Sequence, residues 1–114
     1  GLCAIPMSLD EMLPCVGQAA IGIEIRENDP RLEAVCARLN DSATETCVRA
    51  ERAFLRAMGG GCHLAVAAYA ELEGDRLRLR GVSFLGNAPR RGEMLGSAAE
   101  AEAIGARLAK SLLS

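Results

Sequence analysis

The sequence predicts an α+β fold: a small antiparallel three-stranded sheet with helices packed on one face, preceded by an orphan strand. Three observations support this prediction. Apolar residues recur at helical spacing between residues 30 and 58, alternate with a period of two from residue 64, and return to helical spacing after residue 97. From residue 29 onward the expected order is therefore helix, helix, strand, strand, strand, helix.

Two helices are expected first, and their capping residues place their ends. Asp29 and Pro30 are typical of an N-cap followed by the first helical position. Ser42 and Glu45 form a capping box for the second helix, which ends at Gly59-Gly60-Gly61. The apolar stripes are Leu32, Val35, Cys36 and Leu39 in the first helix, and Cys47, Ala50, Phe54, Ala57 and Met58 in the second.

The change to a period of two at Leu64 predicts a hairpin. Residues 64–72 and 76–80 alternate apolar and polar side chains around the turn 73–75. Gly81 interrupts the alternation, which predicts a bulge there. Residues 92–96 form a third short strand, and Ser97 caps the final helix.

The segment before residue 28 is predicted to contain a short helical turn and a strand that has no neighbouring strand to pair with. Residues 8–14 form a short helical turn, in which Ser8 and Glu11 make a capping box. Residues 19–26 alternate as a strand with three isoleucines on one face, and a single strand cannot satisfy its own backbone. We therefore expect residues 1–27 to complete a preceding domain and residues 28–114 to form the C-terminal domain.

Composition restricts the class of protein. With 114 residues the chain forms at most one ordinary domain, and its net charge of −2 argues against a non-specific nucleic-acid binder. The sequence lacks an apolar run long enough to cross a bilayer. The five cysteines include no C-x-x-C pair, so a zinc site is not expected and the metal prediction is none. An odd cysteine count favours a soluble protein of the reducing cytoplasm.

Cys62 is the candidate functional residue, because it follows three glycines and lies two residues before the predicted hairpin. By position alone, an incidental thiol at a helix–strand junction is the simpler interpretation. A small interaction or regulatory module that adds its orphan strand to a partner remains the alternative function. A thiol-dependent hydrolase is disfavoured, because the sole histidine, His63, is adjacent to Cys62 in sequence.

Three stretches together resemble the C-terminal part of the porphobilinogen deaminase (hydroxymethylbilane synthase) family. They are LPCVGQAAIGIEIR (13–26), ERAFLRAMGGGC (51–62) and LAVAAYAEL (64–72), and the similarity covers nearly the whole chain. The chain departs from the family pattern at Ala19, where a second glycine is usual, at Ala65, where proline is usual, and at His63, which is often glutamine.

The resemblance implies a transferase of tetrapyrrole (haem) biosynthesis, which polymerises four porphobilinogen units on a dipyrromethane primer. It implies that Cys62 holds this cofactor through a thioether, and that Gln18 lies near the active-site cleft. A thiolate suits such a bond, because it attacks electrophilic carbon readily.

The family's catalytic carboxylate and substrate-binding arginines lie in N-terminal domains, so no catalytic residue is expected in this chain. These missing domains are its expected partners. The isolated chain is expected to be inactive, to lack the cofactor, and to pair residues 19–26 with a second copy or pack them irregularly.

Overall fold

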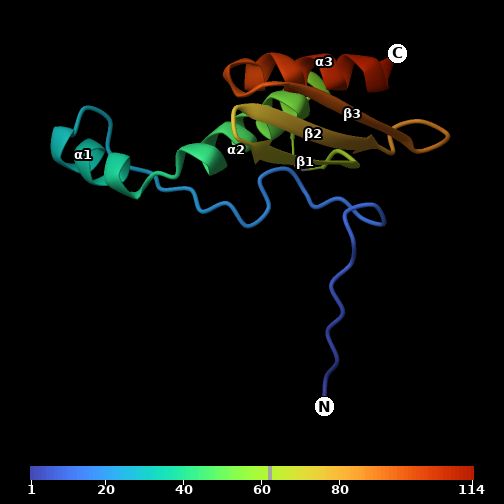
Figure 1. Ribbon diagram of the computed structural model, residues 1–114, viewed down its shortest axis with the longest axis horizontal. Helices are drawn as coiled ribbons and strands as arrows, with labels where there is room; N and C mark the ends of the chain where they lie inside the picture. Colours follow the sequence, from blue (N-terminus) through green and yellow to red (C-terminus); the bar gives the residue numbers. More distant parts are fainter. Residues whose placement is uncertain (62) are drawn as a thin grey trace.

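The computed structural model describes residues 1–61 and 63–114 and confirms the α+β fold class (Figure 1). Within these residues the elements are α1 (Pro30–Leu39), α2 (Ser42–Ala57), β1 (Val66–Glu73), β2 (Arg76–Ser83), β3 (Arg90–Ser97), the 3₁₀ turn η1 (Ala98–Glu100) and α3 (Ala101–Leu113). The three strands form one antiparallel sheet in the order β1-β2-β3. α2 and α3 pack against the same face of this sheet.

The helix caps follow from side chains that accept hydrogen bonds from the first free amides. Asp29 accepts bonds from the N–H groups of Arg31 and Leu32 at 3.1 and 3.2 Å, which confirms the predicted start of α1. The predicted cap of α2 was wrong by one residue. Asp41, and not Ser42, accepts the N–H of Thr44 at 2.7 Å, because a carboxylate one residue earlier is an equally good acceptor.

The predicted bulge at Gly81 was wrong, because the pairing of β1 with β2 continues without interruption from Val66↔Ser83 to Glu73↔Arg76. Gly81 lies in one row with Ala68 and Gly92. A Cβ atom at Gly81 would lie 3.0 Å from the Phe54 ring and 3.1 Å from Leu108. The glycine therefore makes room for large side chains of α2 and α3 rather than breaking the strand.

The core lies between the sheet and the two helices. Its largest fully buried side chains are Phe54, Leu77, Leu79, Ile104 and Leu108. α2 and α3 approach each other closely at Gly105, where an added Cβ would overlap the carbonyl oxygen of Ala50 and come within 2.8 Å of the Phe54 nitrogen. Glycine is thus required at this crossing, because the two helices lie too close together for a side chain.

The orphan strand expected at residues 19–26 is not shown by the structure. Residues 20–26 form no ladder with any described residue, and Ile21 and Ile23 are 92% and 57% exposed. A strand needs a neighbour to bond its backbone groups, and the described residues supply none there. α1 is similarly isolated: none of its residues is buried, although its predicted apolar stripe is present. Figure 1 shows α1 at the end of the molecule away from α3 and the sheet.

Part of the N-terminal segment does dock on the domain. Leu13 is buried, and Val16 packs against the core cluster. The predicted Ser8–Glu11 box forms: the Ser8 N–H donates to the Glu11 carboxylate at 3.1 Å, and the Glu11 N–H donates to the Ser8 hydroxyl at 3.3 Å. It closes only a single turn, however, because the chain continues irregularly through Pro14.

Candidate functional site

The predicted attachment residue, Cys62, lies outside the described residues, whereas its neighbours on both sides are described. Upstream, α2 is followed by three glycines with φ angles of 116°, 67° and 107° at Gly59, Gly60 and Gly61. Such angles are readily adopted by glycine alone. The Gly60 N–H donates to the carbonyl of Leu55 at 2.9 Å and closes the end of the helix. The glycine run therefore serves as the helix terminator that the sequence predicted.

The room available for a side chain differs between these glycines. A Cβ at Gly60 would have no neighbour within 4 Å among the described residues, whereas a Cβ at Gly61 would lie 2.7 Å from the imidazole of His63. His63 is exposed, and Leu64, which packs against the core, donates its N–H to the Gly61 carbonyl at 3.3 Å. The described residues after residue 62 are thus anchored to the domain through Leu64, and among the described residues the half-buried Gly60 leaves room for a side chain.

Gln18, the second predicted residue, lies in the turn formed by residues 16–19. Its side chain is exposed, and its carbonyl oxygen accepts the N–H of Cys15 at 3.3 Å. Ala19 has a φ of 66°, a left-handed conformation that costs a non-glycine residue about 1–2 kcal/mol. The glycine that is usual at this position in the resembled family would adopt the same angle without that cost.

A groove of about 600 Å³ runs beside this turn and is lined by Gln18 together with residues of α2 and β1. The Gly59–Gly61 run is not part of its lining. Among the described residues, Gln18 and the Gly59–Gly61 run therefore do not line the same groove.

Glu51 is a site residue that the sequence did not single out. It is 6% exposed, and its two carboxylate oxygens accept the N–H of Gly17 at 2.7 Å and the N–H of Ala70 at 2.8 Å. Burial raises the pKa of Glu51, and the two N–H bonds offset part of that rise. The signal was present in the sequence, because Glu51 occupies the apolar stripe of α2 four residues after Cys47 and three before Phe54.

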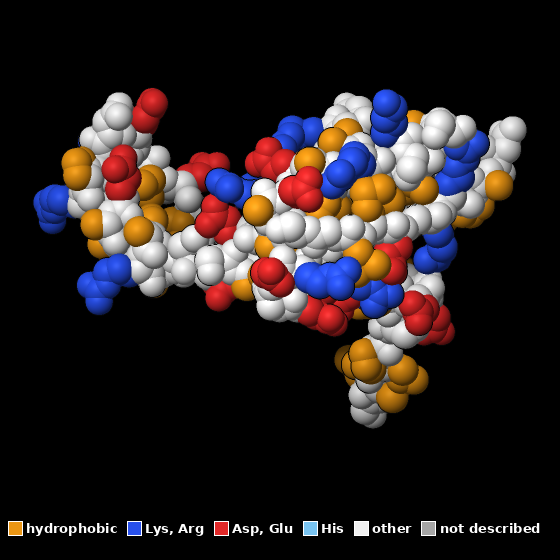
Figure 2. All heavy atoms as spheres, turned by 45° about the horizontal axis from the view of Figure 1, so that its top comes forward, with side chains coloured by type: hydrophobic (Ala, Val, Ile, Leu, Met, Phe, Trp, Pro, Cys, Tyr) orange, Lys and Arg blue, Asp and Glu red, His pale blue; other side chains and the backbone are white. Residues whose placement is uncertain are grey.

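The face of the sheet opposite the helices carries charges that are already paired. Arg80 pairs with Glu71 at 2.7 Å and with Asp10 at 3.5 Å, and its guanidinium lies 5.9 Å from the centre of the Tyr69 ring. Figure 2 shows acidic and basic side chains interspersed on the face of the molecule that it presents. This arrangement does not resemble a one-sign surface for an anionic partner.

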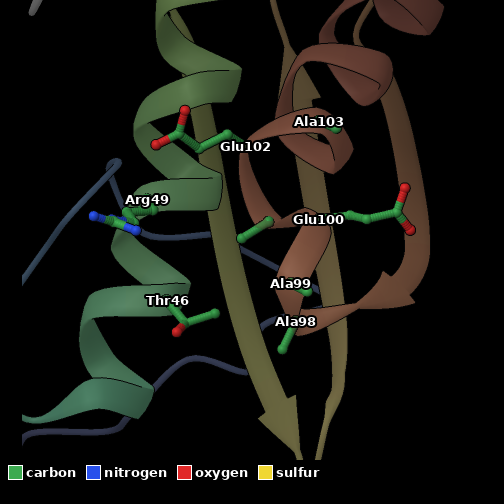
Figure 3. A pocket seen from close by; sticks show the side chains of 8 residues that line it. Thr46, Arg49, Ala98, Ala99, Glu100, Glu102 and Ala103 are labelled. Carbon is green, nitrogen blue, oxygen red and sulfur yellow. The ribbon is translucent and has the colours of Figure 1, made fainter.

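A second hollow, of about 430 Å³, lies between α2 and the start of α3 (Figure 3). Its lining consists of Thr46, Arg49, Glu100, Glu102 and four alanines. Arg49 pairs with Glu45 at 3.3 Å, and the Glu100 side chain points away from Arg49 and Thr46. The hollow therefore lacks a set of converging polar groups that could bind or transform a ligand.

Within residues 1–61 and 63–114, no three His, Cys, Asp or Glu side chains are grouped so that they could hold a metal ion. Over the same residues, none of the helices has the length and apolar character needed to cross a membrane.

Comparison with known proteins identifies the family. Residues 45–114, which include most of α2, the sheet and α3, match the family described as porphobilinogen deaminase, C-terminal domain. The chain belongs to the porphobilinogen deaminase family. A curated porphobilinogen deaminase from Carboxydothermus hydrogenoformans is 43% identical over 109 residues, which are 94% of this chain and 35% of that protein. The chain thus spans about a third of the relative's length, and the resemblance inferred from the sequence motifs is confirmed.

Proposed function

We propose that this chain is the C-terminal part of a hydroxymethylbilane synthase, the transferase that polymerises four porphobilinogen units, and that Cys62 attaches its dipyrromethane cofactor. The family match over residues 45–114 carries this proposal, because it includes the G-G-C stretch that ends at Cys62. It also favours part of a tetrapyrrole enzyme over an unrelated interaction or regulatory module.

The surroundings of Cys62 fit an attached group. Among the described residues, none lies within 4 Å of a Cβ placed at Gly60, and Gly59 and Gly61 are exposed. Leu64 and β1 fix the chain on the other side of the cysteine. A bound dipyrromethane would supply the terminal pyrrole to which further units are added. The protein's own contribution here is the Cys62 sulfur, which as a thiolate can form a carbon–sulfur bond.

Gln18 is the second residue proposed to contact the cofactor or substrate. Its exposed side chain carries both a donor and an acceptor, so it can bind either a pyrrole N–H or a carboxylate. The turn at residues 16–19 presents it at the surface of the domain.

The remaining parts of the enzyme are proposed to precede this chain. Residues 1–27 would complete a preceding domain, and residues 28–114 would form the cofactor-attachment domain. The exposed isoleucines at 21 and 23 and the exposed stripe of α1 support this arrangement, because apolar surface of this kind is normally covered. The catalytic carboxylate and the substrate-binding arginines would then come from those domains.

Turnover by the complete protein tests the proposal. Cys62→Ser is compared with Cys3→Ser, a matched control at an exposed cysteine in the N-terminal segment. Both variants are mixed with porphobilinogen, and the oxidised tetrapyrrole product is measured by absorbance. We expect full activity for Cys3→Ser and none for Cys62→Ser. Equal activity of the two variants would refute the assigned role of Cys62.

A further inference from the structure

The carboxylate of Glu51 joins three separate parts of the chain. It extends from the middle of α2, and its two oxygens bind Gly17, 34 residues upstream, and Ala70, 19 residues downstream. Both bonds are short, at 2.7 and 2.8 Å, as is typical when the acceptor is ionised. One buried side chain therefore bridges the N-terminal turn and the sheet.

The two donors need this acceptor. Ala70 is buried in β1, which lies at the edge of the sheet, and its N–H is bonded to Glu51 rather than to β2. Gly17 lies in the 16–19 turn with a φ of 69°, and the described partner of its N–H is the Glu51 carboxylate. The Ala70 N–H is buried, so leaving it without a partner would be costly, whereas the half-buried Gly17 N–H would have to exchange the carboxylate for water.

The turn is also the last part of the N-terminal segment that is packed. Leu13 and Val16 contact the domain, whereas residues 21–28 are exposed. We propose that Glu51 is the positioning residue that fastens the 16–19 turn to α2 and β1, and thereby fixes Gln18 relative to the C-terminal domain. A role of Gln18 in the reaction rests on the proposed function, whereas the fastening of the turn does not.

Other ionisable groups surround this carboxylate. Cys15 lines the same groove from the N-terminal segment, Cys47 from α2, and Tyr69, Glu71 and Glu73 from β1. Among the described residues, no Lys, Arg or His lines this groove, and the partners of the Glu51 carboxylate there are the two backbone N–H groups.

The first test needs no variant. In ¹H–¹⁵N spectra of the wild-type chain recorded across pH, the amide signals of Gly17 and Ala70 should shift together. They should share one midpoint, set by Glu51, above the ordinary glutamate pKa of 4.5. Amides that do not shift, or that shift at separate midpoints, would overturn the proposal.

The second test removes one acceptor. Glu51→Gln keeps the size of the side chain but places an NH₂ group opposite one of the two donors. The turn can move into water whereas β1 cannot, so Gly17 should lose its partner. Hydrogen exchange of the Gly17 amide should accelerate about tenfold or more, with α3 unchanged.

Glu45→Gln is the matched control on the same helix. The Glu45 carboxylate bonds Asn40 and Arg49 and makes no described bond to the turn, so this variant should leave exchange at residues 13–20 unchanged. Unchanged exchange of Gly17 in Glu51→Gln would refute the proposal. Equal acceleration throughout the chain would refute it too, since it would assign Glu51 to overall stability rather than to the turn.

Discussion

The crossing of α2 and α3 at Gly105 allows a stability prediction whose direction is set by the structure. In the interior of an exposed helix, replacing glycine by alanine stabilises the helix by about 0.8–1 kcal/mol. At Gly105 the added methyl would overlap the Ala50 carbonyl oxygen, lie 2.8 Å from the Phe54 nitrogen, and lie 2.9 Å from the Ala53 Cβ. Two of these three atoms belong to the backbone, so no side-chain rotation can relieve the overlap.

The two helices would therefore have to separate, which loosens the contacts of the buried side chains between them. Overpacking of this kind costs about 1–3 kcal/mol, and the upper end applies because backbone must move. After subtracting the propensity gain, we expect Gly105→Ala to lower the free energy of unfolding by about 1–2 kcal/mol. For a domain of this size that is a decrease in Tm of about 4–16 °C.

Urea unfolding followed by circular dichroism measures this change. Ala106→Gly, at the exposed neighbouring position, is the control, and it should cost about 1 kcal/mol through helix propensity alone. A Gly105→Ala chain as stable as the wild type, or more stable, would show that the helices do not meet at this point.

Three further predictions concern the charge of Glu51, the isolated chain and its exposed isoleucines. The stability difference between wild type and Glu51→Gln should fall as the pH rises from about 4.5 to the raised native pKa of Glu51, as measured by urea unfolding across pH. The 114-residue chain alone should not turn over porphobilinogen, and turnover that persists after repurification would contradict this. Light scattering should show self-association with increasing concentration that Ile23→Lys abolishes, because burying one such side chain is worth about 1.5–3 kcal/mol.

The sign of the pH effect follows from proton binding. Burial raises the pKa of Glu51 in the folded chain, so between the unfolded and folded pKa values the folded state holds more protons. Stability therefore decreases with rising pH in that window and becomes constant above it. A stability difference between wild type and Glu51→Gln that increases with pH would contradict the direction of the pKa shift.

For the association experiment, a monomer at every concentration with residues 19–26 protease-sensitive would contradict both pairing and irregular packing.

Local patterns in the sequence were sufficient for most of the fold. The Asp29–Pro30 start of α1 and the alternation that gives β1 and β2 depend on neighbouring residues only, and both formed. The third strand was found as well, although β3 extends from Arg90 to Ser97 rather than over 92–96 alone. Periodicity reports which face of an element is apolar, and that is a property of the segment itself.

The predictions that were wrong, missing or not shown concern places where the local structure depends on residues far away in the sequence. Residues 19–26 alternate like a strand, yet strand formation requires a neighbour that the described residues do not provide. The sequence around Gly81 indicated a bulge, because it does not show that Gly81 pairs with Ala68 or that it faces the Phe54 ring. Glu51 was missed for the same reason, since its two donors are 34 and 19 residues away.

The central claim is that Cys62 carries the covalent cofactor, and intact mass spectrometry of the complete protein tests it most directly. The wild-type protein should be heavier than its sequence by the mass of a dipyrromethane, and peptide mapping should place the addition on the fragment containing Cys62. Cys62→Ser should lack the addition, whereas Cys3→Ser should retain it. An unchanged mass increment in Cys62→Ser would contradict the account.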